Sequence, residues 1–180
     1  MIECTSMYDG QVEHILLAHG KGNILDKDML SALREHLSTL THSSLKLIVF
    51  EGRGRHFSFG ASVEEHLPEF VSEMLSDFHS LFYELEALGI PTMALVRGCC
   101  FGGGFELATW CGRVLVTPDA KLAIPEVKLG VFPPVASLGL SWRVGGAFGT
   151  DLVLTGRTLS AQEALKIGLV DQCVEDLDAA

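Results

Sequence analysis

Residues 98–108 read Gly-Cys-Cys-Phe-Gly-Gly-Gly-Phe-Glu-Leu-Ala, and this stretch decides how the rest of the chain is interpreted. It follows a short apolar run at 92–96 and leads into a segment with helical character. Glycines before a helix allow close backbone approach, and the first N–H groups of the helix have no partner within it and favour negative charge. The run is neither G-x-G-x-x-G nor a P-loop, since Phe105 follows the three glycines. We therefore expect an amide site for an oxygen atom here, and no nucleotide cradle of either type.

Working outward, strand-like and helix-like segments alternate along all 180 residues, which predicts an α/β fold. Asp26 is expected to cap a helix whose apolar residues recur at threes and fours, and Ser160 is expected to cap a later one. No low-complexity linker interrupts the chain, so we predict a single domain over 1–180. The expected strands are 12–18, 45–50, 92–96, 113–117 and 121–124, and the expected helices are 27–40, 69–88, 105–110, 138–144, 150–154 and 161–167.

Charge and cysteine usage exclude several classes of protein. The formal charge of −10 argues against a broad basic face for nucleic acid. The five cysteines form no C-x-x-C pair, so we expect reduced thiols and no metal site. The first residues lack the basic and apolar regions of a signal peptide, and no apolar run reaches the roughly 20 residues of a membrane span. These features predict a soluble, cytoplasmic protein with no membrane partner.

Two glutamates lie in apolar surroundings. Glu106 comes one turn into the helix after the glycines, and Glu126 follows Pro125 at the end of a short strand. Charged residues are seldom buried without a partner, so each is either a structural carboxylate or a functional one. Two carboxylates facing one substrate can divide the general-acid and general-base roles that water addition to a conjugated double bond requires.

Several motifs, in order along nearly the whole chain, resemble the enoyl-CoA hydratase (crotonase) superfamily. The glycine stretch resembles its signature, and Pro125-Glu126 resembles its second-glutamate motif. Segments 23–25, 57–62, 154–156 and 161–170 resemble its remaining motifs. The resemblance implies a crotonase-like spiral of ββα units with parallel sheets. It also implies trimers, often paired into hexamers. Family members usually continue as further helices, so a C-terminal helical trimerisation region is expected to be missing or truncated here.

The resemblance also implies the roles of individual residues. Glu106 and Glu126 match the two catalytic glutamates, while Ala61 and Gly103 match the donors of the oxyanion hole for the thioester oxygen. No cofactor or metal is implied, because coenzyme A is part of the acyl-CoA substrate. The predicted substrate- and CoA-binding residues are Ile24, Ala61, Ser62, Val63, Glu64, Gly102, Gly103 and Pro134.

Two positions depart from the family pattern. Ser62 replaces the usual aspartate, and Pro133-Pro134 replaces Pro-Gly, so an amide that relatives can offer to the catalytic water is missing. The combination of 57–68 with 129–137 most resembles dienoyl-CoA hydratases of anaerobic aromatic degradation, in the benzoyl-CoA route. Those enzymes add water to cyclohexa-1,5-diene-1-carbonyl-CoA.

Other functions remain open at this point. One alternative is a short-chain enoyl-CoA hydratase or isomerase of fatty-acid β-oxidation, or a thioester hydrolase that needs only one carboxylate. Another is a catalytically inactive or RNA-binding relative. Outside the motifs, His66 is a weak pocket candidate, and Trp110 and Trp142 are expected in the core.

Overall fold

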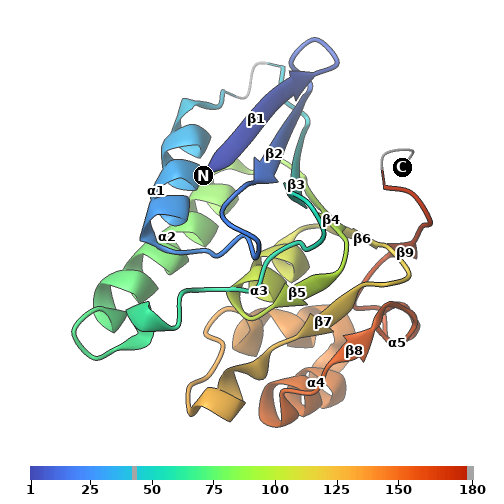
Figure 1. Cartoon of the computed structure of the whole chain (residues 1–180). Helices are drawn as coiled ribbons and strands as arrows, with labels where there is room; N and C mark the ends of the chain where they lie inside the picture. Colours follow the sequence, from blue (N-terminus) through green and yellow to red (C-terminus); the bar gives the residue numbers. More distant parts are fainter. Residues whose placement is uncertain (42–43, 178–180) are drawn as a thin grey trace.

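The computed structural model describes residues 1–41 and 44–177. Residues 42–43 and 178–180 belong to the predicted single domain of 1–180 but lie outside the described residues. Two sheets and five α-helices organise the described chain (Figure 1). The strands are β1 (Ile2–Met7), β2 (Val12–Leu17), β3 (Leu47–Gly52), β4 (Thr92–Val96), β5 (Cys99–Phe101), β6 (Arg113–Val116), β7 (Lys121–Ala123), β8 (Leu159–Ser160) and β9 (Gln172–Cys173). The helices are α1 (Lys27–Thr39), α2 (Val71–Leu88), α3 (Gly103–Trp110), α4 (Ala136–Thr155) and α5 (Ala161–Lys166), with short 3-10 helices η1 (Glu64–His66) and η2 (Pro125–Leu129).

The larger sheet has the strand order β1-β2-β3-β4-β6-β9 and is parallel except for β1, which pairs antiparallel with β2. The smaller sheet has the order β5-β7-β8, with β8 antiparallel to β7. Figure 1 shows α1 and α2 side by side at one end of the molecule, whereas α4 and α5 lie with β7 and β8 at the other. One apolar core joins the buried faces of both sheets to these helices. The predicted α/β class is therefore confirmed.

The predicted helix caps are confirmed. The Asp26 side chain accepts a hydrogen bond from the Met29 amide at the start of α1. Ser160 and Glu163 form a reciprocal capping box at the start of α5. These caps are local features, so the sequence around each is enough to place it.

Three expectations were incomplete or wrong. The sequence reading missed β1, an exposed edge strand. The helices expected over 138–144 and 150–154 are the two segments of α4, which meet at a kink at Gly145, where φ is 77° and ψ is 159°; α4 extends beyond the expected bounds, from Ala136 to Thr155. Trp142 is not in the core, since 81% of it is exposed, whereas Trp110 is half-buried against the core. Trp142 lies on a helix face that the described chain leaves uncovered.

Asn23 ties the loops behind the site together. Its buried side-chain amide donates hydrogen bonds to the carbonyl oxygens of Arg53, His56 and Phe57, at 3.1, 2.9 and 3.2 Å, and its Oδ1 accepts one from the His19 amide. One side chain therefore satisfies four backbone groups and fixes the loop after β2 against the loop after β3.

Candidate active site

The glycine run begins α3 where the chain passes from β5 into the helix. Gly102 precedes the first turn with φ 52° and ψ −129°, in the left-handed range of φ that favours glycine. A Cβ atom added to Gly102 would lie 3.0 Å from Oε1 of Glu126. The absence of a side chain at this position therefore lets the second glutamate come against the first turn of α3.

The two predicted oxyanion-hole residues lie close together. Residues 58–61 run beside residues 100–103, and a Cβ atom added to Gly60 would lie 3.0 Å from the amide nitrogen of Gly103. A Cβ atom added to Gly103 would in turn lie 3.4 Å from the amide nitrogen of Ala61. Gly103 is the first residue of α3, so its N–H has no partner within the helix. Ala61 and Gly103 thus bring two backbone amides to one place.

Glu106 lies one turn into α3 and is only 2% exposed. Its Oε1 accepts hydrogen bonds from the amides of Val135 and Ala136, at 2.8 and 2.7 Å. The pKa of Glu106 is raised to about 8, chiefly by burial; the negative charge of Glu126 contributes to the rise, and the two amides oppose it. Glu106 is therefore a carboxyl group that can carry a proton near neutral pH.

Glu126 lies in η2 directly after Pro125, and it is 9% exposed. Among the described residues, its buried Oε2 has no hydrogen-bond partner. Burial raises the pKa of Glu126, whereas its own backbone amide and the nearby His66 lower it. A buried oxygen without a partner costs free energy in the folded protein, and it is available to water or substrate.

The segment around Pro134 supports Glu106. Pro134 itself offers no amide, as the sequence predicts. The next two residues, the N-cap Val135 and Ala136, the first residue of α4, supply both amides that hold Glu106. Pro134 therefore directly precedes the two residues that hold the Glu106 carboxyl group.

The predicted CoA-binding residues spread around the oxyanion loop. Ile24 is half-buried and precedes Leu25, whose amide donates to the Gly60 carbonyl at 2.9 Å. Val63 is exposed, while Ser62 and Glu64 line a cavity of about 460 Å³. Carboxylates dominate this cavity, so it does not favour a phosphate group. Its lining residues are Asp26, Lys27, Leu30, Ser62, Glu64, Glu65, Phe70, Glu73, Met74 and Asp77.

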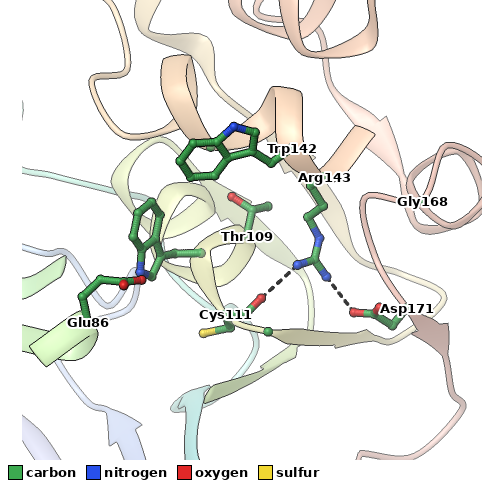
Figure 2. Close-up of a pocket in the computed structure, with 10 residues that line it drawn as sticks. Glu86, Thr109, Cys111, Trp142, Arg143, Gly168 and Asp171 are labelled. Atoms are coloured by element: carbon green, nitrogen blue, oxygen red, sulfur yellow. Dashed lines mark hydrogen bonds and ion pairs between the residues drawn. The ribbon is translucent and has the colours of Figure 1, made fainter. Parts of the chain in front are cut away.

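A second cavity, of about 470 Å³, lies away from both glutamates and contains none of the predicted site residues (Figure 2). Arg143 crosses it and donates to the Cys111 carbonyl at 2.9 Å and to the Asp171 carboxylate at 2.6 Å. The side chain of Trp142 projects over its rim (Figure 2). These contacts join α3, α4 and the segment before β9, so we interpret the cavity as structural.

Comparison with known proteins identifies the family. The model of the enoyl-CoA hydratase/isomerase family matches residues 9–179. The chain belongs to this family. Its resemblance to the crotonase superfamily is confirmed, and so is the predicted crotonase-like fold. As predicted, the protein is a hydratase enzyme of a family that acts on acyl-CoA thioesters.

Individual members of the family are similar to this chain in sequence and in structure. The chain is 41% identical over 173 residues to the cyclohexa-1,5-dienecarbonyl-CoA hydratase of Thauera aromatica, covering 96% of this chain and 67% of that protein. DspI of Pseudomonas aeruginosa superposes with a TM-score of 0.90 at 28% identity, covering 98% of this chain and 70% of DspI. The enoyl-CoA hydratase of Bacillus anthracis superposes with a TM-score of 0.89 at 28% identity, covering 96% and 69%. None of the helices in the described part of this chain combines the length and apolar content that a bilayer crossing requires.

Sequence reasoning understated two residues of this family member. His66 was only a weak candidate, yet it lies near enough to Glu126 to lower its pKa, and its Nδ1 lies 2.7 Å from the Ser62 carbonyl. Phe78 of α2 lies in the helix expected over 69–88, but nothing in the sequence singles it out as a site residue. A Cβ atom added to Gly103 would lie 3.0 Å from the Phe78 ring, so this ring closes one side of the amide site.

The raised pKa of Glu106 predicts a pH-dependent cost to stability. Below pH 4.5 the carboxyl group is protonated in both the folded and the unfolded chain. As the pH rises from 4.5 to about 8 it ionises more readily in the unfolded chain, so the free energy of unfolding falls across this range. Glutamine cannot ionise, so the Glu106→Gln variant should not show this fall. Its free energy of unfolding relative to that of the wild type should therefore increase by roughly 1–3 kcal/mol between pH 5 and pH 8. Urea unfolding at several pH values measures this difference. A difference that stays constant with pH would show that Glu106 ionises without penalty.

Proposed function

We propose that this enzyme adds water to a cyclic conjugated dienoyl-CoA thioester of the cyclohexa-1,5-diene-1-carbonyl-CoA type, a step of anaerobic benzoyl-CoA degradation. The observation that carries the proposal is that two buried carboxyl groups, Glu106 and Glu126, lie beside the backbone amides at the start of α3. The substrate class is supported by the 41% identity to a hydratase with that name. Coenzyme A enters as part of the substrate, and no separate cofactor is proposed.

The proposed chemistry begins at the thioester carbonyl. The amides of Ala61 and Gly103 donate hydrogen bonds to its oxygen, which gains negative charge as water adds to the conjugated system. Two amides aimed at this oxygen lower the barrier because they are already in place before the charge develops. The close approach of residues 58–61 to residues 100–103 supports this role.

The two glutamates then share the proton transfers. The pKa values of both Glu106 and Glu126 are raised by burial, and the Glu126 charge raises that of Glu106 further, which favours one proton on the pair. The ionised carboxylate takes a proton from the water molecule as the water oxygen bonds to a carbon of the conjugated system. This addition forms the enolate of the thioester. The protonated carboxyl gives its proton to the enolate carbon. The net change is the addition of one water molecule, and the pair again holds one proton.

Substrate choice is tested with crotonyl-CoA and cyclohexa-1,5-diene-1-carbonyl-CoA, each followed by the loss of conjugated absorbance. We expect faster turnover of the cyclic diene, with incorporation of labelled water oxygen at carbon. Turnover of crotonyl-CoA alone would leave a hydratase but contradict the proposed substrate. Isomerisation or thioester cleavage without label at carbon would contradict hydration itself.

The acid/base assignment predicts that Glu106→Gln and Glu126→Gln each lower kcat by about 10²- to 10⁴-fold, because each removes a group that exchanges a proton with the substrate. Binding of a CoA thioester should change little, as measured by calorimetry with a non-reactive analogue. Glu69→Gln, at an exposed position, is the matched control and should keep full activity. Full activity in either test variant would overturn the two-glutamate mechanism.

We further propose that the subunits associate as homotrimers or hexamers. Support comes from large exposed apolar residues on α4 and on the loop before it, namely Val131, Phe132, Leu138, Trp142 and Phe148. Apolar patches of this kind commonly mark contact surfaces.

This assembly is tested by Trp142→Glu, which places a charge on the exposed face of α4. We expect the variant to shift toward monomer in analytical ultracentrifugation. Tyr83→Glu, at an exposed position on α2, is the matched control and should assemble as the wild type does. A wild-type chain that sediments only as a monomer would contradict the proposal.

A further inference from the structure

Three potential metal ligands converge at the edge of the larger sheet, outside the site described above. Cys4 comes from β1, Glu13 from β2 and His36 from the last turn of α1. In the antiparallel pair of β1 and β2, Ser6 lies opposite Glu13, and Cys4 lies two residues from Ser6. Since alternate residues share a face, Cys4 and Glu13 project from the same face of the sheet, where they meet His36.

The distances fit a single ion. The Cys4 Sγ, a carboxylate oxygen of Glu13 and a ring nitrogen of His36 all lie within 4.8 Å of one another. Within this group, His36 Nε2 lies 2.9 Å from Glu13 Oε1. Ligand atoms at 2.0–2.3 Å from a tetrahedral ion are separated by roughly 3.3–3.8 Å, so small side-chain movements suffice to form the site.

The ligand chemistry favours zinc. A thiolate, an imidazole and a carboxylate together suit a borderline-soft ion, whereas calcium and magnesium prefer oxygen ligands alone. Glu13 is 7% exposed and half-buried His36 lies beside it, so these two ligands are held by the fold. Cys4 is exposed, which leaves a path for the ion to enter.

We propose that Cys4, Glu13 and His36 form a zinc site with three protein ligands and a fourth position for water. Cysteine spacing alone predicted no such site, because only one of its ligands is a cysteine and the other two come from β2 and α1. The site would tie edge strand β1 to helix α1 independently of the hydratase chemistry.

Binding requires a change of proton state at Cys4. Partial burial and the charge of Glu13 raise the pKa of the Cys4 thiol, so without metal the thiol keeps its proton. Zinc binding breaks the S–H bond, forms a Zn–S bond and releases the proton to water. Before zinc binds, the N–H at His36 Nε2 donates to the Glu13 carboxylate at 2.9 Å. On binding, the neutral imidazole changes tautomer: the proton passes through water from Nε2 to Nδ1, and the freed Nε2 lone pair and the Glu13 carboxylate both bind the ion. No oxidant or reductant takes part.

The experiment titrates the whole chain, freed of metal, with zinc against a chromophoric chelator and with cobalt as a spectroscopic probe. We expect one equivalent of metal per chain and a thiolate-to-cobalt charge-transfer band. Cys4→Ser and His36→Gln should each weaken zinc binding by at least the ~10- to 100-fold that loss of a supporting contact causes, and both should lose the band or weaken it. Cys173→Ser, at a half-buried free thiol on β9, is the matched control and should bind as the wild type does.

Alkylation of the unmodified protein gives a second measurement that needs no variant. Zinc should slow the reaction of Cys4 with iodoacetamide, read by peptide mass spectrometry, and leave the rate at Cys173 unchanged. A cobalt complex without a thiolate band, equal affinity in Cys4→Ser, or no protection of Cys4 would each overturn the proposal.

Discussion

The close approach of two backbone segments, residues 58–61 and residues 100–103, is the constraint on which the site depends. It brings the amides of Ala61 and Gly103 together, and it requires glycine at position 60, where a Cβ atom would lie 2.8 Å from the Phe101 carbonyl. The approach is held by the Phe101 amide, which donates to the Ser58 carbonyl at 2.9 Å. Behind it, the Ser58 hydroxyl donates to the Asn23 carbonyl at 2.7 Å. The loops are therefore fixed before any substrate arrives.

The same close packing buries the carboxyl groups of Glu106 and Glu126, and burial disfavours their ionised forms. Glu106 is partly compensated by two amides, while Oε2 of Glu126 has no partner among the described residues. Burial without full compensation lowers stability, and proteins keep such groups mainly where chemistry needs a shifted pKa. The two glutamates thus differ in their supporting contacts, although both follow an apolar segment of sequence.

The parts predicted from the sequence were those fixed by local chemistry. Asp26 and Ser160 cap helices through hydrogen bonds within three residues, so the sequence around each was enough to place it. Strand β1 was missed because it is exposed and is held by pairing with β2 rather than by its own apolar pattern. Trp142 was wrongly expected in the core, because an apolar residue on a helix can face either the core or an uncovered surface and the sequence does not distinguish the two. The order of motifs pointed to the glutamates and glycines of the site, but their spacing could not reveal that α4 supplies the amides for Glu106.

Helix α4 links Glu106 to the surface of the molecule. Its N-cap Val135 and its first residue Ala136 hold Glu106. The helical segment that they begin, which ends at the kink at Gly145, exposes Leu138 and Trp142 to solvent. A helix segment moves as a rigid unit, so a contact made on its outer face also fixes the two amides at its start. Loss of those amides would raise the pKa of Glu106 further, because both now oppose the effect of burial. A subunit contact on this face would therefore tune the proton on the glutamate pair without touching either carboxyl group.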